Sequence, residues 1–223
     1  MCGRFEIHSE IEIIARLYNA GFEQWITDFK PSYNVAPTDS VVIIINDGNR
    51  HLITAKWGLI PSWSKDPKMG FKTINARAET VTEKPAFRDA FRKSRCLVIA
   101  DGFYEWKTVG RLKKPMLIRL KSKKPMAFAG LYSVWTSPDG KKINTCTIIV
   151  TNANELIAPI HDRMPVILNA KDQEIWLNPS NHDADTLTPL LRSYPAEELE
   201  LYEVSSKVNS VKNNDAALIL PVQ

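Results

Sequence analysis

About half of this 223-residue chain, residues 41–151, is a series of short apolar runs separated by turn signals. The first two runs, in VVIIINDGNRHLITAKW (41–57), flank Asp47-Gly48, a dipeptide typical of tight hairpins. Further runs rich in β-branched and aromatic residues follow at 96–106, 115–120, 125–135 and 145–151, and SPDG at 137–140 has the composition of a turn. Because consecutive strands joined by short connections pair antiparallel, this region predicts a series of antiparallel strands.

Segments with helical spacing lie on both sides of this series. In SEIEIIARLYN (9–19), Ser9 is a candidate N-cap ahead of apolar residues at helical intervals. Further short helices are expected at 84–94, 152–160, 171–178 and 183–194, and the chain returns to a strand at LYEVS (201–205). We find no repeat and no Pro/Gly/Ser-rich linker. The pattern predicts an α+β fold, in which residues 1–223 form a single domain with a curved antiparallel sheet or barrel-like core and peripheral helices.

The composition is that of a globular protein, with 44% hydrophobic and 24% charged residues. The formal net charge of +4 is compatible with nucleic-acid binding but does not demand it, and the basic segment 111–125 resembles a charged hairpin. Cys96 and Cys146 lie in strand-like runs and are expected to be buried. The sequence shows no signal peptide and no membrane-length apolar run, so a cytoplasmic location and no membrane partner are expected. No CxxC or HxxxH spacing is present, so neither a metal site nor another cofactor is predicted.

Cys2 is the most unusual residue of the sequence, because it directly follows the initiator methionine in MCGRF. Removal of Met1 would give Cys2 a free α-amine and a thiol on adjacent carbons. An α-amine has a pKa near 8, compared with about 10.4 for lysine, so more of it is neutral at physiological pH. With an aldehyde, such an amine forms an imine, and the thiol can close onto the imine carbon to give a thiazolidine. The alternative is an incidental cysteine at a frayed terminus.

Two titratable residues are candidates for proton transfer. Glu105 lies between aromatic residues in FYEW (103–106), where burial would raise its carboxyl pKa; an edge-strand glutamate that faces water is the alternative. His161 in IHDRMPVIL (160–168) could polarise a carbonyl or sugar oxygen, or could simply be a hydrogen-bonded loop histidine.

Two further groups of residues could contact nucleic acid. Asn75 and Arg77 alternate in NARAET (75–80) and would share one face of a strand, where they suit a phosphodiester or a sugar as well as they suit a surface ion pair. The proline-containing loops YNVAPT (33–38) and WGLIPSW (57–63) could form a rigid wall that stacks unpaired bases. Within these loops, Trp57 is expected in the core and Trp63 on the surface.

Taken together, the motifs MCGRF, YNVAPT, WGLIPSW, NARAET, DGFYEW, IHDRMPVIL and VNSVKNN resemble, in the same order, those of the SOS response-associated peptidase family of abasic-site processing proteins. The resemblance spans residues 2–222 and is weakest at 107–145. It implies autoproteolytic removal of Met1 and capture of an abasic site in single-stranded DNA through a reversible thiazolidine crosslink that shields the lesion. It also implies lyase-type covalent DNA chemistry and a nucleoid-associated location when DNA is bound. The protein partners cannot be predicted.

The resemblance also implies a role for each residue of the matching motifs. The catalytic residues would be Cys2, Asn75, Glu105 and His161. The DNA-binding residues would be Arg4, Asn34, Pro37, Trp63, Arg77, Trp106 and Arg163. Two other functions remain open: a cysteine hydrolase in which Cys2 attacks an amide and its α-amine is the base, and a non-covalent single-stranded DNA-binding module.

Overall fold

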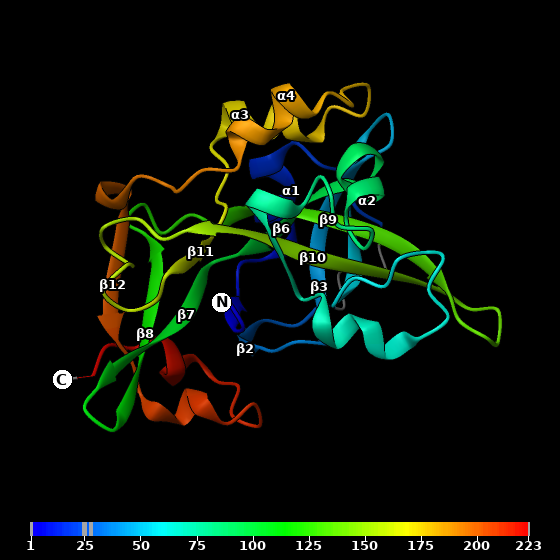
Figure 1. The fold of residues 1–223 in the computed structure, drawn as a ribbon. Coiled ribbons are helices and arrows are strands. Elements are labelled where there is room, and N and C mark those ends of the chain that lie inside the picture. The colour runs from blue at the N-terminus through cyan, green and yellow to red at the C-terminus, as the bar shows by residue number, and fades with distance from the viewer. Residues whose placement is uncertain (1, 24–25, 27–28, 223) are drawn as a thin grey trace.

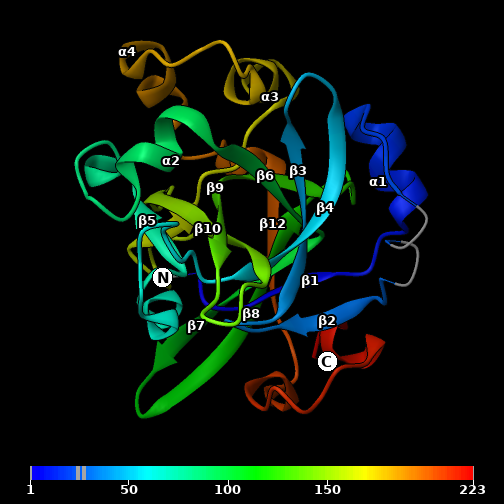
Figure 2. The same ribbon diagram turned by 90° about the vertical axis from the view of Figure 1, so that its right-hand side faces the viewer.

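The computed structural model describes residues 2–23, 26 and 29–222 of the chain. Within this part, five strands close into a ring in which β10 pairs with β4, β4 with β3, β3 with β6, β6 with β9, and β9 again with β10 (Figure 2). Their bounds are β3 Ser40–Asn46, β4 Arg50–Trp57, β6 Arg95–Ala100, β9 Met126–Thr136 and β10 Lys142–Asn152. The α+β fold with a barrel-like core is therefore confirmed, including the 41–57 hairpin with its turn at Asp47-Gly48.

A second sheet packs beside the barrel, with the strand order β12-β8-β7-β1-β2 (Figure 1). Its strands are β1 Phe5–Ile7, β2 Ser32–Val35, β7 Gly102–Val109, β8 Leu112–Leu120 and β12 Leu199–Glu203. The chain passes from the barrel to this sheet at Asp101, between β6 and β7. The basic segment 111–125, which was expected to be a charged hairpin, is instead one strand of a hairpin and the turn after that strand. β8 runs through most of the segment, and the hairpin joins β7 to β8 through Gly110-Arg111.

The strand β10 brings two short strands together at its carboxyl end. Along one edge it pairs first with β9 and then with β11 (Arg163–Pro165); along the other it pairs first with β4 and then with β5 (Asn75–Arg77). The pairings with β4 and β5 are parallel, which adds two exceptions to the predicted antiparallel pattern. Val150 is the partner of both Arg77 and Pro165 in these pairings, so β5 and β11 flank the same stretch of β10.

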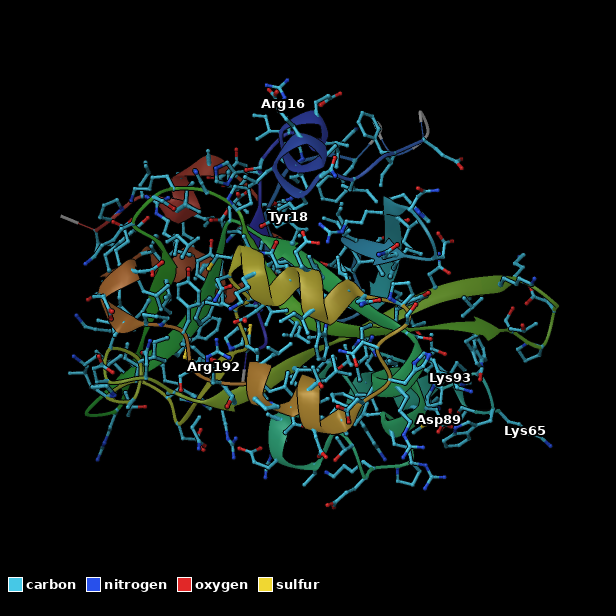
Figure 3. The ribbon with its side chains drawn as sticks, turned by 90° about the horizontal axis from the view of Figure 1, so that it is seen from above. Arg16, Tyr18, Lys65, Asp89, Lys93 and Arg192 are labelled. Carbon is cyan, nitrogen blue, oxygen red and sulfur yellow. The ribbon has the colours of Figure 1, made fainter. Side chains whose placement is uncertain are left out.

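The helices lie at the periphery, as expected, and Figure 3 shows α3 and α4 across one side of the barrel. Their bounds are α1 Ile11–Tyr18, α2 Arg88–Lys93, α3 Ala170–Leu177 and α4 Ala184–Leu187, with 3-10 turns at Pro67–Lys72, Ala78–Thr80, Thr188–Leu190, Ala196–Glu198, Ser206–Asn209 and Ala216–Ile219. Helix α1 buries Ile11, Ile14, Ala15 and Tyr18. No helix in the described part of the chain is long and apolar enough to cross a membrane.

Three helix predictions need correction. Ser9 is not the N-cap of α1: Glu10 holds that position, and the Ser9 hydroxyl donates to Asp101 instead. The predicted helix 152–160 is a set of turns. Pro159 accounts for this, since proline lacks an N–H and disfavours helical backbone in the residue before it. The predicted helix 183–194 is shorter than expected. α4 ends at Leu187, and a 3-10 turn that contains Pro189 follows it.

The core fills the barrel and the space between it and the second sheet. Cys96, Cys146 and Trp57 are fully buried in it, as predicted. Phe5 of β1 packs on Trp57 with ring centroids 5.0 Å apart, so the amino-terminal strand is tied to the barrel by aromatic contact. This contact fixes where the segment before β1, which carries Cys2, enters the molecule.

Candidate functional site

Cys2 is fully buried and lies just before β1, near the chain end marked N in Figure 1. Two hydrogen bonds hold this segment in place. The backbone N–H of Tyr104 in β7 donates to the Arg4 carbonyl over 2.9 Å, and the Asn75 side-chain amide donates to the Cys2 carbonyl over 2.7 Å. The Cys2 residue is therefore fixed to β7 on one side and to β5 on the other, which is the opposite of a frayed terminus.

The Cys2 thiol is held in its neutral form. Burial raises its pKa well above the ordinary value, and the negative charge of Glu105 raises it further, while a hydrogen bond from the Arg4 backbone opposes the rise. A neutral thiol is a poor nucleophile until its proton is removed. Chemistry at Cys2 therefore needs a base close by.

Glu105 has the properties of such a base. It is only 3% exposed, and its side chain leaves β7 on the face opposite Tyr104 and Trp106. Burial, followed by the negative charge of Asp162, raises the pKa of the Glu105 carboxyl to about 7. A carboxyl group with this pKa exchanges protons readily at neutral pH.

His161 lies in the loop that leads into β11. Its Nδ1 accepts a hydrogen bond from the Arg163 backbone N–H over 3.0 Å and lies 2.8 Å from an Asp162 carboxylate oxygen. Partial burial lowers its pKa, and the Asp162 charge opposes this shift. The Arg163 N–H suits an Nδ1 without a proton, whereas the Asp162 carboxylate suits an Nδ1 that carries one, so the ring can hold its proton on either nitrogen. A ring with a lowered pKa can exchange a proton near neutral pH.

Asn75 joins Cys2 to a potential ligand. While its amide nitrogen holds the Cys2 carbonyl, its oxygen Oδ1 is buried and has no hydrogen-bond partner among the described residues. A buried carbonyl oxygen without a partner costs free energy, so it favours a ligand or reaction group that donates to it.

Arg77 and Arg163 lie on one face of the β10 sheet. Arg77 is opposite Val150 and Arg163 is opposite Asn152, and positions two apart on a strand share a face. Arg77 is exposed, and Arg163 is held by an ion pair with Glu79. Asn75, opposite Ile148, shares this face with Arg77, as the alternation in NARAET predicts.

Arg4 and Asn34 are engaged with the carboxyl-terminal segment. Arg4 Nη1 donates to Asn34 Oδ1 and to the Val208 carbonyl over 2.5 and 2.8 Å. The Asn34 amide, in turn, donates to the carbonyls of Val208, Ser210 and Asn213. Asn34 is 3% exposed, so the predicted direct contact of Asn34 with DNA does not fit this arrangement. Its side chain positions Arg4.

The predicted aromatic residues are found in two separate places. Trp106 is half-buried: its ring lies 5.9 Å from the Arg4 guanidinium, and its Nε1 donates to Asn209. Trp63 is 57% exposed, as predicted, and lines a groove with α2 and β9 whose lining residues include none of the four predicted catalytic residues. Figure 3 labels Asp89 and Lys93 of α2 in this groove, with Lys65 of the Trp63 loop on the same side of the molecule. Pro37 lies partly exposed in the turn between β2 and β3.

Comparison with known proteins identifies the family. The family model of the SOS response associated peptidase (SRAP) matches residues 1–211. The chain belongs to the SRAP family.

This SRAP protein is 52% identical over 223 residues to the abasic site processing protein YoqW of Bacillus subtilis, with 98% of this chain and 99% of YoqW covered. It is also 33% identical to the abasic site processing protein HMCES of Gallus gallus, over 90% of this chain and 69% of that protein. A crystal structure of a protein from Bacteroides thetaiotaomicron superposes over 100% of both chains with a TM-score of 0.92 at 28% identity.

The structure of this SRAP protein also contains site features that sequence reasoning missed. Asp162 acts on the pKa values of both Glu105 and His161, although only its neighbours were singled out. Asn209, which accepts from Trp106, belongs to the VNSVKNN motif, so the order of the motifs was a signal that this segment matters.

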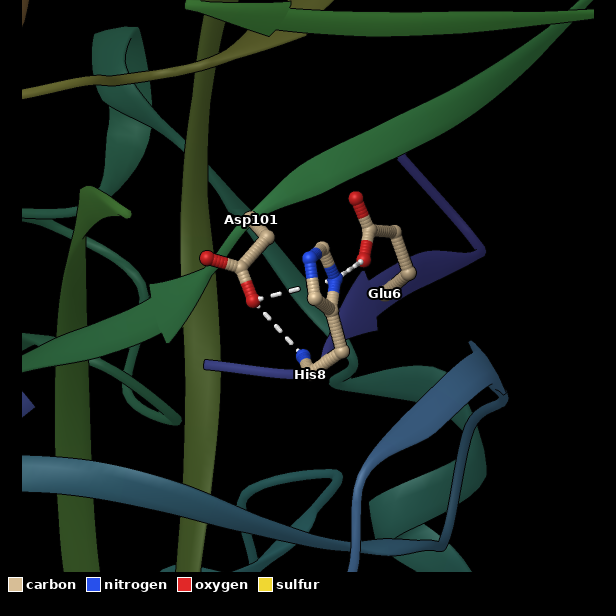
Figure 4. A group of neighbouring side chains, drawn as sticks. All are labelled: Glu6, His8 and Asp101. Carbon is tan, nitrogen blue, oxygen red and sulfur yellow. Dashed lines mark hydrogen bonds and ion pairs between the residues drawn. The ribbon is translucent and has the colours of Figure 1, made fainter. Parts of the chain in front are cut away.

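A second polar cluster, formed by Glu6, His8 and Asp101, lies at the junction of β1 with the β6–β7 corner (Figure 4). Its residues are the one group in the described part of the chain whose spacing could hold a metal ion. Their contacts are those of a hydrogen-bond network: His8 Nδ1 lies 2.6 Å from Glu6, and one Asp101 oxygen accepts the backbone N–H groups of His8 and Ser9. The cluster anchors the amino-terminal strand, because it ties His8 and Ser9 to the start of β7.

Proposed function

We propose that this protein processes abasic sites in single-stranded DNA, and that Cys2, exposed by removal of Met1, forms a reversible thiazolidine crosslink with the lesion. The observation that carries the proposal is the position of Cys2: its carbonyl is bound by Asn75, and its thiol lies in the field of Glu105. Membership of the SRAP family and similarity to proteins named for abasic site processing support the choice of substrate.

The reaction is proposed to begin at the abasic sugar, whose ring-opened form is an aldehyde. His161 Nε2–H donates to the sugar oxygen and promotes ring opening. The Cys2 α-amine adds to the aldehyde carbon to give a carbinolamine, which loses water to form an imine. Asn75 Oδ1 accepts a hydrogen bond from the Cys2 amine and orients it during this addition.

The second step closes the ring. Glu105, as the carboxylate, takes the thiol proton of Cys2 while the sulfur adds to the imine carbon, and the proton is delivered to the imine nitrogen. One carbon–sulfur bond forms, the carbon–nitrogen double bond becomes single, and no redox partner is needed. Reversal follows the same proton path, so Glu105 also serves release of the crosslink.

DNA binding is proposed to rest on cations near this pocket and on aromatic surfaces both beside it and in the separate groove that Trp63 lines. Arg77, Arg163 and Arg4 contact phosphates, whereas Asn34 acts by positioning Arg4. Trp106 and Trp63, with Pro37, form surfaces for unpaired bases, which favours single strands over a duplex. A net charge of +4 is sufficient for this mode of binding, because the covalent bond keeps the protein on the DNA.

Amide hydrolysis by Cys2, which the family description "peptidase" brings to mind, is the second candidate. It fits less well, because a buried thiol with a raised pKa attacks a weakly electrophilic amide slowly. An imine carbon is a stronger electrophile and can be attacked as the thiol loses its proton to Glu105.

The proposal is tested by incubating the protein with an oligonucleotide that carries one abasic site. A covalent adduct that survives heat and detergent without any reductant is expected for single-stranded substrate. The same protein without Cys2, or a substrate with an intact base, should give none. Absence of an adduct from protein shown by mass to begin at Cys2 would refute the proposed function.

A further inference from the structure

The hairpin formed by β7 and β8 projects beyond the second sheet (Figures 1 and 2). β12 pairs with β8 only at Met116–Leu120, and β1 pairs with β7 only near Gly102 and Phe103. Beyond the hydrogen bond from the Val204 N–H to the Pro115 carbonyl and the ion pair of Lys114 with Glu203, the distal part, residues 107–114, has no third strand beside it in the described part of the chain. A two-stranded ribbon alone is marginally stable in water, so its side chains are expected to have a use outside the fold.

Several residues between Glu105 and the turn of this hairpin lie on the same face of the ribbon as Glu105. Glu105 is opposite Met116, Lys107 is opposite Lys114, and Val109 is opposite Leu112. Since opposite and alternate residues of a strand pair share a face, these three pairs form one row. The row begins at the buried carboxyl of the candidate site, passes a lysine pair and ends at an apolar tip.

The tip has the composition of a nucleic-acid contact. Val109 and Leu112 are 45% and 67% exposed, although both are aliphatic. The exposed cations Lys107, Arg111 and Lys113 surround them, and residues 106–120 contain no Asp or Glu. Lys113 pairs with Thr108 on the opposite face from Lys107, so cations flank the apolar tip on both sides.

We propose that this hairpin is an arm that binds the single strand of DNA where it leaves the Glu105 pocket, with Lys107 and Lys113 on phosphates and the Val109–Leu112 pair against a nucleobase. This inference rests on the proposed function. Four residues of strand separate Val109 from Glu105, or about 13 Å at 3.3 Å per residue. This length equals about four nucleotides at the 3.4 Å spacing of stacked bases in a duplex, and fewer for a more extended single strand.

A protein partner fits this tip less well. Stable protein interfaces bury about 800 Å² on each side, whereas the apolar part of the tip is a single pair of aliphatic side chains. Lys114 is paired with Glu203 over 2.9 Å, whereas Lys107, Arg111 and Lys113 are exposed cations that complement phosphates, and the tip is continuous with the site proposed to hold the lesion.

The test measures non-covalent binding by fluorescence anisotropy. The probe is a single strand with a tetrahydrofuran abasic analogue, which has no aldehyde and cannot crosslink, flanked by two or by eight nucleotides on either side. Two double variants are compared with wild type: Lys107→Gln with Lys113→Gln, and Val109→Ser with Leu112→Ser. The matched control is Lys121→Gln with Lys124→Gln, which removes the same charge from exposed positions beyond the other end of β8.

Wild type should bind more tightly when one flank is lengthened from two to eight nucleotides. The lysine variant should lose this gain, and the slope of log Kd against log salt on the long probe should fall by about 1.4, for two phosphate contacts on single-stranded DNA. The Val109/Leu112 variant should lose about fivefold in affinity for the long probe at an unchanged slope. The control should retain the wild-type gain and slope.

Three results would overturn the arm: no gain with either long flank, hairpin variants that bind the long probe like wild type, or a double-stranded flank that binds better than a single-stranded one. Failure of the proposed function would appear elsewhere, as absence of an adduct with an authentic abasic site. The anisotropy measurement does not depend on that chemistry.

Discussion

Replacement of Glu105 by glutamine should stabilise the protein at alkaline pH, because the wild-type carboxyl is held in an environment that disfavours its charge. Burial and the Asp162 charge raise the pKa of Glu105 from an ordinary 4.5 to about 7. Each pH unit of difference corresponds to about 1.36 kcal/mol. Glu105 is nearly fully buried, so full ionisation costs the folded state roughly 3 kcal/mol.

The destabilisation by Glu105 depends on pH, because its carboxyl ionises at different pH values in the folded and the unfolded state. Below pH 4.5 the carboxyl is protonated in both the folded and the unfolded state, and Glu105 imposes no penalty. Between pH 4.5 and about 7 the unfolded state releases the proton first, so the stability of wild type falls relative to the variant. Above this window the full difference is present, because both states are ionised. Glu105→Gln mimics the protonated form throughout.

The assay is urea unfolding of both proteins from pH 4.5 to 8.5. The free energy of unfolding of Glu105→Gln minus that of wild type should rise with pH by roughly 3 kcal/mol. In an Asp162→Asn background the rise should be smaller, since one cause of the raised pKa is gone. A difference that stays constant with pH would refute the argument, because it would show that Glu105 does not titrate with a raised pKa.

Three further predictions follow from the site. His161→Ala should form the covalent adduct about 10²–10⁴-fold more slowly than wild type but should still form it, as single-turnover kinetics would show; loss of all adduct would contradict a proton-transfer role. Arg77→Ala should weaken capture at limiting DNA concentration and leave the saturated rate unchanged, so an altered saturated rate would assign Arg77 to the chemistry. Asn34→Ala should lower the free energy of unfolding by about 1–3 kcal/mol, because buried donors and acceptors lose their partners; unchanged stability, measured by urea unfolding, would show that its hydrogen bonds to the carboxyl-terminal segment are unimportant.

Local patterns predicted much of the fold. The β3–β4 hairpin was predictable because Asp47-Gly48 accommodates its tight turn, with Gly48 at φ 125°. For Glu105 the sequence left two alternatives open, a buried carboxyl and an edge-strand glutamate that faces water, and the structure buries it. The helix predicted at 152–160 failed because its apolar spacing was given more weight than Pro159.

The pairings that create the site depend on distant segments, so local patterns could not reveal them. Nothing in NARAET shows that Asn75 pairs with Ile148 in parallel, or that its amide meets the Cys2 carbonyl. The position of Asn34 was also hidden, since its acceptors are backbone carbonyls of residues 208–213, which leave no mark on side-chain identity. The order of the family motifs supplied the connection between these segments before their contacts were known.

In the proposed crosslink, Cys2 joins the lesion through both its amine and its thiol. The most direct test is mass spectrometry of the peptide that begins at Cys2, isolated from the adduct with an abasic oligonucleotide. We expect a peptide that carries the ring-opened sugar less one water, with the same mass whether or not borohydride was present, and a Cys2 thiol that iodoacetamide cannot alkylate. A peptide that gains two hydrogens with borohydride, retains an alkylatable thiol, or carries the sugar on another residue would contradict the thiazolidine.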